Sequence, residues 1–354
     1  QFGEGEVFAE PAGKGRAIDL LGALAIGKLG ALRDVGGQAQ FVVVSGDDLA
    51  VAGHHQVRLD IVGALENGQR IGGQGVLRQV AAGAAVGEIE MMSGRARGVV
   101  GVDTTTGDEF RVTADRIIVA AGALGSPALL LRSGIDELSP GGDWIGRRLM
   151  RHCNAVLTGV FPFVTNPDQV FHKQLCLTDF YEDLRVELGT AVGTIQDIYT
   201  PSADVIKHFA PLGLRRVAGR LTQYMQNLLV VAEDDPQRDN RVSLTDERDL
   251  YGHRVARVDH DYSVADVRRR DYLIHRARRI LRRAGAWITR LYEIDSFSHG
   301  VGTVGMGESP ASSALDARCR VWGTEGLWVV DGSCFPTSAG VNPSLTIAAN
   351  ALRV

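Results

Sequence analysis

The sequence predicts a mixed α/β fold that contains both parallel and antiparallel strands. Residues 116–121 form a continuous apolar run, as expected for a strand inside a parallel sheet. Residues 155–163 and 190–198 have the composition of strands in an antiparallel sheet. Residues 327–347 indicate a strand, a glycine-broken loop and a helix, in that order. These runs predict an α/β protein with more than one sheet.

Composition and charge are ordinary for a folded, soluble protein. The chain has 354 residues, which is enough for two domains or one large one. Hydrophobic residues make up 45% of it and charged residues 23%, and the formal net charge is −4 with no acidic or basic tail. We therefore expect no nucleic-acid partner and no membrane partner.

The cysteine pattern predicts free thiols. No cysteine belongs to a C-x-x-C pair, and the spacings fit neither a zinc site nor a small disulfide scaffold. We therefore expect no metal site and a reducing, cytoplasmic location. The apolar run at residues 18–26 is too short for a membrane helix and contains Asp19. The cysteines are Cys153, Cys176, Cys319 and Cys334.

Residues 1–85 carry the weakest structural signals in the chain. Residues 41–45 and 57–62 could be strands. Residues 17–32 could be a helix, but its interior glycines would each weaken it by about 1 kcal/mol relative to alanine.

A hairpin and a short helix are predicted on either side of the apolar strand. Residues 98–103 and 109–113 predict the two strands of the hairpin. After the apolar strand, Ser126 is the predicted N-cap and Pro127 the first residue of a helix that continues through Leu131.

Residues 264–284 predict a long helix that is rich in arginine. An apolar stripe at helical spacing is formed by Val267, Ile274, Ala277 and Leu281. The arginines could contact nucleic acid, but a solvated helix face with acidic partners one turn away is the favoured interpretation. They are Arg268, Arg269, Arg270, Arg276, Arg278, Arg279, Arg282 and Arg283.

The strand, loop and helix at 327–347 have features that would stabilise negative charge. Asp331 and Gly332 end the strand with an acid and a flexible turn. Asn342 is a good helix N-cap, and Pro343 suits the first helical position. The helix start would direct unpaired N–H groups at whatever lies in front of it, which favours an anion there.

Three motifs resemble those of one enzyme family. They lie at residues 117–127, 298–307 and 323–347. Their residues and their order are similar to those of the glucose–methanol–choline (GMC) flavin oxidoreductases. The resemblance extends from about Glu88 to the end of the chain and does not include the first eighty or so residues.

The resemblance implies an α/β fold with a partial, Rossmann-like FAD-binding domain and an inserted, antiparallel-sheet substrate-binding domain. The FAD-binding domain would comprise residues 86–151 and 297–354, and the substrate-binding domain residues 152–296. Residues 141–150 resemble the family's loop that approaches the flavin. Residues 1–85 stay unassigned, as a segment that is non-native to this fold or disordered.

The resemblance also implies FAD-dependent oxidation of a CH–OH group in an alcohol, sugar or polyol. His299 matches the family's catalytic histidine and would accept the hydroxyl proton while hydride passes to the flavin. Asn342 stands where the family has histidine or asparagine, and it would orient the alcohol. An asparagine that merely caps the helix is the alternative. For the other eight histidines we favour an ordinary structural role.

Seven positions resemble the family's cofactor contacts. Asp331 and Gly332 match positions near the flavin's phosphate and ribityl chain, although an aspartate at a strand end is also a common turn former. The others match positions where backbone approaches the cofactor or where the helix start faces the ring. The full set is Gly122, Ala123, Ser126, Asp331, Gly332, Asn342 and Pro343.

The partner that the sequence indicates is a small-molecule alcohol or sugar. Residues 171–174, Phe-His-Lys-Gln, suggest a polar substrate such as a sugar or polyol, although such a run is also typical of a strand with one solvated face. The sequence does not indicate the electron acceptor.

The first 85 residues lack the expected dinucleotide-binding motif. A family member should open with a strand, a G-x-G-x-x-G turn and a helix that hold the pyrophosphate. Residues 13–18 come nearest, but they lack the third glycine and a preceding apolar strand. The chain is then a fragment or a mis-started reading frame, which we favour, or it has a diverged cofactor domain. Two alternative functions follow: a non-catalytic remnant unable to bind FAD, and a flavin-dependent lyase on the same scaffold.

Overall fold

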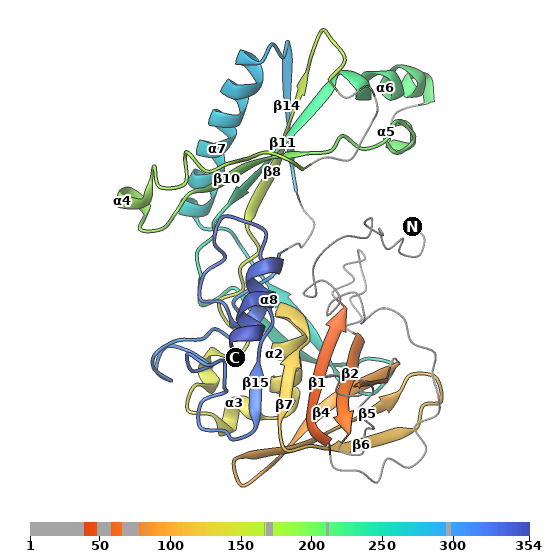
Figure 1. Cartoon of the computed structure of the whole chain (residues 1–354), viewed down its shortest axis with the longest axis vertical. Coiled ribbons are helices and arrows are strands. Elements are labelled where there is room, and N and C mark those ends of the chain that lie inside the picture. The colour runs from red at the N-terminus through yellow and green to blue at the C-terminus, as the bar shows by residue number, and fades with distance from the viewer. Residues whose placement is uncertain are drawn as a thin grey trace, which may run out of the picture.

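The computed structural model has a mixed sheet at one end and an antiparallel sheet with a long helix at the other (Figure 1). The C-terminal helix lies between these two parts, near the middle of the molecule. The structure describes residues 39–47, 58–65, 78–81, 83–165, 167, 173–209, 212–294 and 299–354. The helix predicted at residues 17–32 lies outside the described residues.

Strand β7 (Ile117–Ala120) lies inside the mixed sheet. It is parallel to both of its neighbours, β1 (Ala39–Asp47) and β15 (Leu327–Val329). Two antiparallel strands, β2 (Arg58–Leu65) and β3 (Arg78–Ala81), complete the order β15-β7-β1-β2-β3. The predicted parallel strand is therefore confirmed, and β1 and β2 confirm the two strands predicted within the first 85 residues.

A separate antiparallel sheet of three strands packs nearby. It contains β4 (Ala84–Met92), β5 (Arg95–Asp103) and β6 (Glu109–Thr113), in that order. The Asp103 carboxylate accepts the Thr105 N–H at 2.8 Å and so closes the turn between β5 and β6. The predicted hairpin is confirmed.

Helix α2 (Gly122–Arg132) begins earlier than the sequence predicts. Gly122 has a φ of 76°, which a glycine adopts without the steric cost of a Cβ. The prediction that Ser126 caps the helix is therefore wrong: Ser126 lies inside α2, and its hydroxyl accepts the Ala121 N–H at 3.0 Å. Pro127 is also inside the helix, so its nitrogen has no hydrogen to donate to the carbonyl four residues before it.

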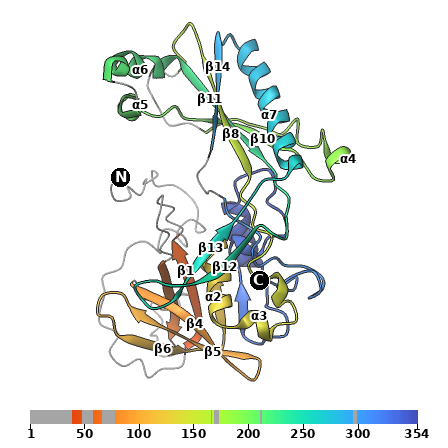
Figure 2. The ribbon, with the colours of Figure 1, turned by 180° about the vertical axis from the view of Figure 1, so that it is seen from behind.

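A hairpin of β12 (Arg241–Arg248) and β13 (Arg254–Asp259) packs against α2, as the rear view shows (Figure 2). The Arg132 guanidinium at the end of α2 donates to the Arg254 carbonyl at 2.8 Å. Two short elements follow α2, namely α3 (Ile135–Leu138) and η1 (Gly142–Trp144).

The second large sheet is antiparallel throughout and has the order β14-β8-β11-β10-β9. It confirms the antiparallel strands predicted at 155–163 and 190–198. Its strands are β8 (Cys153–Val160), β9 (Cys176–Leu177), β10 (Gly193–Ile198), β11 (Met225–Ala232) and β14 (Ile288–Glu293). Short helices between these strands are α4 (Arg185–Leu188), α5 (Ala203–Phe209), η2 (Leu212–Leu214), α6 (Arg215–Leu221) and η3 (Thr222–Tyr224).

Helix α7 (Val264–Arg283) covers one face of this second sheet (Figure 1). Ser263 and Asp266 form a reciprocal capping box, in which each side chain accepts the other residue's N–H. The predicted apolar stripe is buried at Ile274, Ala277 and Leu281, which pack with the strands. Burial of this stripe, rather than helix propensity alone, holds α7 in place.

Arg269 corrects the interpretation of the arginines as a solvated face. Its side chain is fully buried and donates to Asp266 at 2.9 Å and to Asp235 at 2.8 Å. Two carboxylates compensate the desolvation of one guanidinium, which is the condition for burying a charge. The ion pair between Arg269 and Asp235 anchors α7 to the segment that follows β11.

The 299–307 motif pairs with the segment that follows β15. The N–H groups of Gly302, Val304 and Met306 donate in turn to the carbonyls of the three residues of η4 (Gly332–Cys334), at 3.1, 2.8 and 2.8 Å. The last helix is α8 (Ser344–Arg353). The two motifs that lie furthest toward the C-terminus therefore form one local unit.

Within the part of the chain that the structure describes, no helix has the length and apolarity required to span a bilayer.

We expect Gly302→Ala to destabilise the protein by about 1–3 kcal/mol, because Gly302 has a φ of 96° and an added Cβ would overlap the Arg148 carbonyl and the Met150 methyl group. Gly107→Ala is the matched control, since Gly107 also has a positive φ but has open space around it. Urea unfolding of both variants measures the difference. Equal destabilisation by the two substitutions would show that the close packing at Gly302 is unimportant.

Candidate active site

His299, Asn342 and His152 meet where three segments far apart in the sequence come together. His299 Nε2 lies 3.0 Å from Asn342 Nδ2, and His299 Nδ1 lies 3.0 Å from His152 Nδ1. The predicted pair is thus in direct contact. His152 is an addition that the sequence did not indicate, because we assigned an ordinary structural role to every other histidine.

A backbone carbonyl sets the protonation pattern of both rings. His152 Nε2 lies 2.9 Å from the Ser338 carbonyl oxygen, which can only accept, so Nε2 carries the proton. The Nδ1 atom of neutral His152 is then an acceptor, and His299 Nδ1 must donate to it. This assignment leaves the lone pair of His299 on Nε2, the atom that faces Asn342.

Asn342 turns its side chain toward His299 and does not cap the helix. The residue that precedes α8 is Pro343, and no side chain caps its first turn. The prediction that Asn342 is the N-cap is therefore wrong. Its Nδ2 faces His299, while Lys173 Nζ donates to its Oδ1 at 3.3 Å. Lys173 therefore fixes which end of the amide faces the imidazole, since an ammonium cannot bond to an NH2 group.

A buried carboxylate holds the backbone at His152. Asp234 accepts the N–H groups of Arg151 at 2.8 Å and His152 at 3.1 Å. Burial alone would raise the pKa of Asp234, but hydrogen bonds from His260, Arg151 and Ser338 hold it below its ordinary value. The Tyr262 hydroxyl donates to the His152 carbonyl at 2.8 Å. The left-handed backbone of His152, with a φ of 61°, is thus fixed from both sides.

Burial favours the neutral form of both imidazoles. It is the largest of the influences that lower the pKa of His299 to about 4, and the neighbouring His152 and Lys173 act in the same direction. Burial also lowers the pKa of His152, although the Ser338 carbonyl and Asp234 oppose this. His299 at neutral pH is therefore an unprotonated group that can accept a proton.

Asp331 joins α2 to η4 beside this site. Its carboxylate accepts the Gly122 N–H at 3.1 Å, the Ser126 hydroxyl at 2.5 Å and the Ser333 N–H at 2.7 Å. Burial raises its pKa, and these three donors oppose the rise. Three of the predicted cofactor positions, Gly122, Ser126 and Asp331, are therefore bonded to one another.

The Ala123 carbonyl connects α2 to the histidine motif, because it lacks the usual donor within the helix. Pro127 cannot donate to the Ala123 carbonyl, and Thr303 fills that vacancy with its hydroxyl at 2.7 Å. The bond ties the loop after His299 to the helix after β7.

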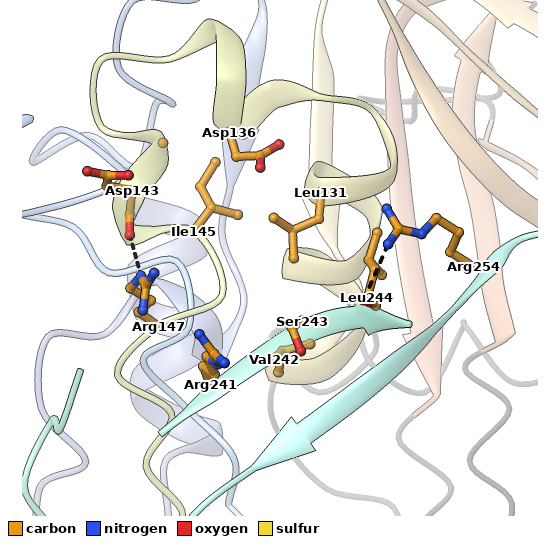
Figure 3. Close-up of a pocket in the computed structure, with 11 residues that line it drawn as sticks. Leu131, Asp136, Asp143, Ile145, Arg147, Arg241, Val242, Ser243, Leu244 and Arg254 are labelled. Carbon is orange, nitrogen blue, oxygen red and sulfur yellow. Dashed lines mark hydrogen bonds between the residues drawn. The ribbon is translucent and has the colours of Figure 1, made fainter. Parts of the chain in front are cut away.

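A cavity of about 290 Å³ lies elsewhere in the fold, and Figure 3 shows the residues that line it. It lies between the end of α2, the η1 region and β12, and it contains neither histidine of the site. Arg147 donates to the Asp143 carbonyl at 2.8 Å at its edge. None of the residues predicted to be catalytic or to bind the cofactor lines it, although four lining residues belong to the 141–150 loop predicted to approach the flavin.

Comparison with known proteins identifies the family. Two family models, both described as GMC oxidoreductase, match residues 61–154 and 236–351, which together exceed half of the chain. The chain belongs to the GMC oxidoreductase family. The match begins at residue 61, so the predicted start of the resemblance at Glu88 lies too far toward the C-terminus.

The GMC chain is similar to several curated proteins. It is 32% identical over 279 residues to 6'''-hydroxyparomomycin C oxidase of Streptomyces lividus, covering 74% of this chain and 48% of that protein. It is 28% identical over 292 residues to 2-methyl-1,2-propanediol dehydrogenase of Mycolicibacterium austroafricanum, covering 76% and 52%. The chain thus spans about half the length of the curated relatives that it matches.

Solved flavoenzyme structures share the fold of this GMC chain. Formate oxidase of Aspergillus oryzae RIB40 matches with a TM-score of 0.54 at 14% identity, over 76% of this chain and 58% of that one. Pyridoxine 4-oxidase of Mesorbium loti matches with a TM-score of 0.51 at 19% identity, over 76% and 55%. The predicted α/β class is confirmed, and FAD is the cofactor of this family.

The start of α8 fits the flavin end of FAD. The first turn of α8 is open, with Leu345 83% exposed, and its N–H groups suit a developing negative charge. The pyrophosphate end of FAD would need a G-x-G-x-x-G turn that leads into a helix. Residues 300–305 have that spacing, but they form a loop against η4 and lead into no helix, so they do not match this motif.

We expect the contribution of His299 to the free energy of unfolding to be constant near pH 7.5 and to decrease as the pH falls from about 6.5 toward 4. The unfolded chain protonates His299 near 6.5, whereas the folded chain resists protonation down to about 4, so acid favours the unfolded state. Urea unfolding between pH 4.5 and 7.5 measures this slope. His299→Gln should reduce the slope by up to one proton, whereas substitution of the exposed His275 should leave it unchanged. An unchanged slope in His299→Gln would contradict the assignment.

Proposed function

We propose that this chain carries the catalytic part of an FAD-dependent oxidoreductase that acts on the CH–OH group of a sugar, polyol or other alcohol. The observation that supports this most directly is the neutral His299 with its lone pair on Nε2, 3.0 Å from an oriented amide. Bound FAD would supply the acceptor for the hydride. Residues 331–333 and the start of α8 would hold its flavin end.

In this proposal, the substrate hydroxyl displaces the direct contact between His299 Nε2 and Asn342 Nδ2 and bonds to both groups. His299 accepts the hydroxyl proton as the C–H bond breaks, because Nε2 carries the lone pair of the imidazole. Asn342 Nδ2 donates to the developing alkoxide, since Lys173 holds the Oδ1 end of the amide. His152 does not touch the substrate: it is a positioning residue that keeps the His299 proton on Nδ1.

The substrate class that we propose is a small molecule with several hydroxyl groups. Lys173 and Asn342 add polar contacts beside the reacting atom. Two of the similar proteins are oxidases of 6'''-hydroxyparomomycin C and of paromamine, and a third is a dehydrogenase of 2-methyl-1,2-propanediol. Of the predicted 171–174 segment, residues 171 and 172 lie outside the described residues.

We expect His299→Gln to lower the rate of anaerobic flavin bleaching by a polyol or sugar by roughly 10²–10⁴-fold, because it removes the general base. The experiment uses purified protein supplied with FAD, and stopped-flow absorbance measures the bleaching. His275→Gln serves as the control and should bleach at the wild-type rate. A His299→Gln protein as fast as wild type would remove this residue from the reaction.

We expect His152→Phe to slow the same bleaching by roughly tenfold or more, because the His299 proton could then move to Nε2 and occupy the lone pair that the substrate needs. His152→Gln should restore most of the rate, since its side-chain oxygen can accept from His299 Nδ1. Stopped-flow rates for the two variants, with the flavin spectrum as a check on folding, distinguish tautomer control from simple packing. Equal losses in both variants would argue against tautomer control.

The same measurements separate the alternative functions. A lyase would convert its substrate without lasting flavin bleaching under anaerobic conditions. A remnant without activity would show no flavin absorbance after addition of FAD and gel filtration. Either result would replace the proposed oxidation.

A further inference from the structure

Two buried thiols lie in and beside η4, which contains residues that we propose to hold the flavin end of FAD. Cys334 belongs to η4, and Cys319 belongs to the turn at 316–320; both side chains are fully buried. Each thiol influences the pKa of the other as a side-chain hydrogen-bond partner. Asn350 Nδ2 on α8 lies 3.4 Å from Cys319 Sγ and 3.3 Å from Cys334 Sγ, so one amide bridges the two sulfurs.

Charge and hydrogen bonds make the two sulfurs unequal. The hydrogen bond from Cys334 is the largest influence that lowers the pKa of Cys319, to about 7, against the opposing effect of burial. Asn350 and the Arg353 guanidinium, 4.0 Å from Cys319 Sγ, act in the same direction. The hydrogen bond to Cys319, together with burial, raises the pKa of Cys334. Near neutral pH, Cys319 therefore has thiolate character while Cys334 keeps its proton.

We propose that Cys319 and Cys334 form a redox-active dithiol that a hydroperoxide converts to an intramolecular disulfide. The Cys319 thiolate attacks the peroxide O–O bond, so a sulfenic acid forms and hydroxide leaves as water after protonation. The Cys334 sulfur then attacks the sulfenic sulfur, the S–O bond breaks, and a second water leaves. Overall the two thiols lose two electrons and two protons, and hydrogen peroxide becomes two waters. This chemistry does not require the proposed alcohol oxidation.

The position of the pair indicates how it is reached and what it changes. Both sulfurs lie beneath α8, so we expect peroxide to reach them when this helix opens locally. The disulfide would join the 316–320 turn to η4, which carries Gly332 and Ser333. A cross-link of this span restricts the unfolded chain and should raise the melting temperature by about 4–8 °C.

The decisive experiment uses the wild-type protein. The protein is treated with a small excess of hydrogen peroxide, alkylated, digested without reduction and mapped by mass spectrometry. We expect a peptide pair linked through Cys319 and Cys334, lighter by two hydrogens, that forms faster as the pH rises through about 7. Sulfinic acid at Cys319 without the linked peptide would overturn the proposal. So would an unchanged pair of thiols at a peroxide dose that oxidises the exposed Cys176.

Variants check the two roles separately. Cys334→Ser should leave a sulfenic acid at Cys319 that dimedone traps, and Cys319→Ser should abolish both the trapped product and the cross-link. Cys176→Ser is the matched control and should form the cross-link at the wild-type rate. If either buried variant fails to fold, the wild-type peptide map still decides the question.

Discussion

The hydrogen bond between His152 and the Ser338 carbonyl governs the chemistry of the site. A carbonyl oxygen can only accept, so this contact fixes one proton on His152, then one on His299, and leaves a lone pair beside Asn342. This arrangement of protons on the two histidines requires no charged partner. The same contact joins the segment before α8 to the start of β8, so the two segments that carry Asn342 and His152 hold each other in position.

The rest of the fold maintains this contact through buried polar groups. Asp234 holds the His152 backbone, and the neighbouring Asp235 receives the buried Arg269 of α7. On the other side, Asp331 joins α2 to η4, and Thr303 closes the gap that Pro127 leaves in α2. Each buried group is compensated by partners from a different segment, which makes these contacts costly to break singly.

Much of the fold followed from local patterns. The apolar strand β7, the β5–β6 hairpin, helix α7 and the strand β15 were all predictable from periodicity and turn residues. The errors occurred where tertiary contacts override a local preference. Asn342 and Ser126 are good caps, yet each side chain has a distant partner, His299 and Asp331 respectively. The sequence predicts Arg269 to be a surface residue, because the Asp235 carboxylate that pairs with it lies far away in the sequence.

By itself, the sequence determined the family, the α/β class and the pairing of His299 with Asn342, because three ordered motifs carry that information in short segments. Only the tertiary structure revealed His152, the direction of the Asn342 amide and the Cys319–Cys334 pair. Each depends on side chains that come together from segments separated in the chain. Hydrogen bonds and proton positions depend on distance and angle in space, and residue spacing within one motif does not contain them.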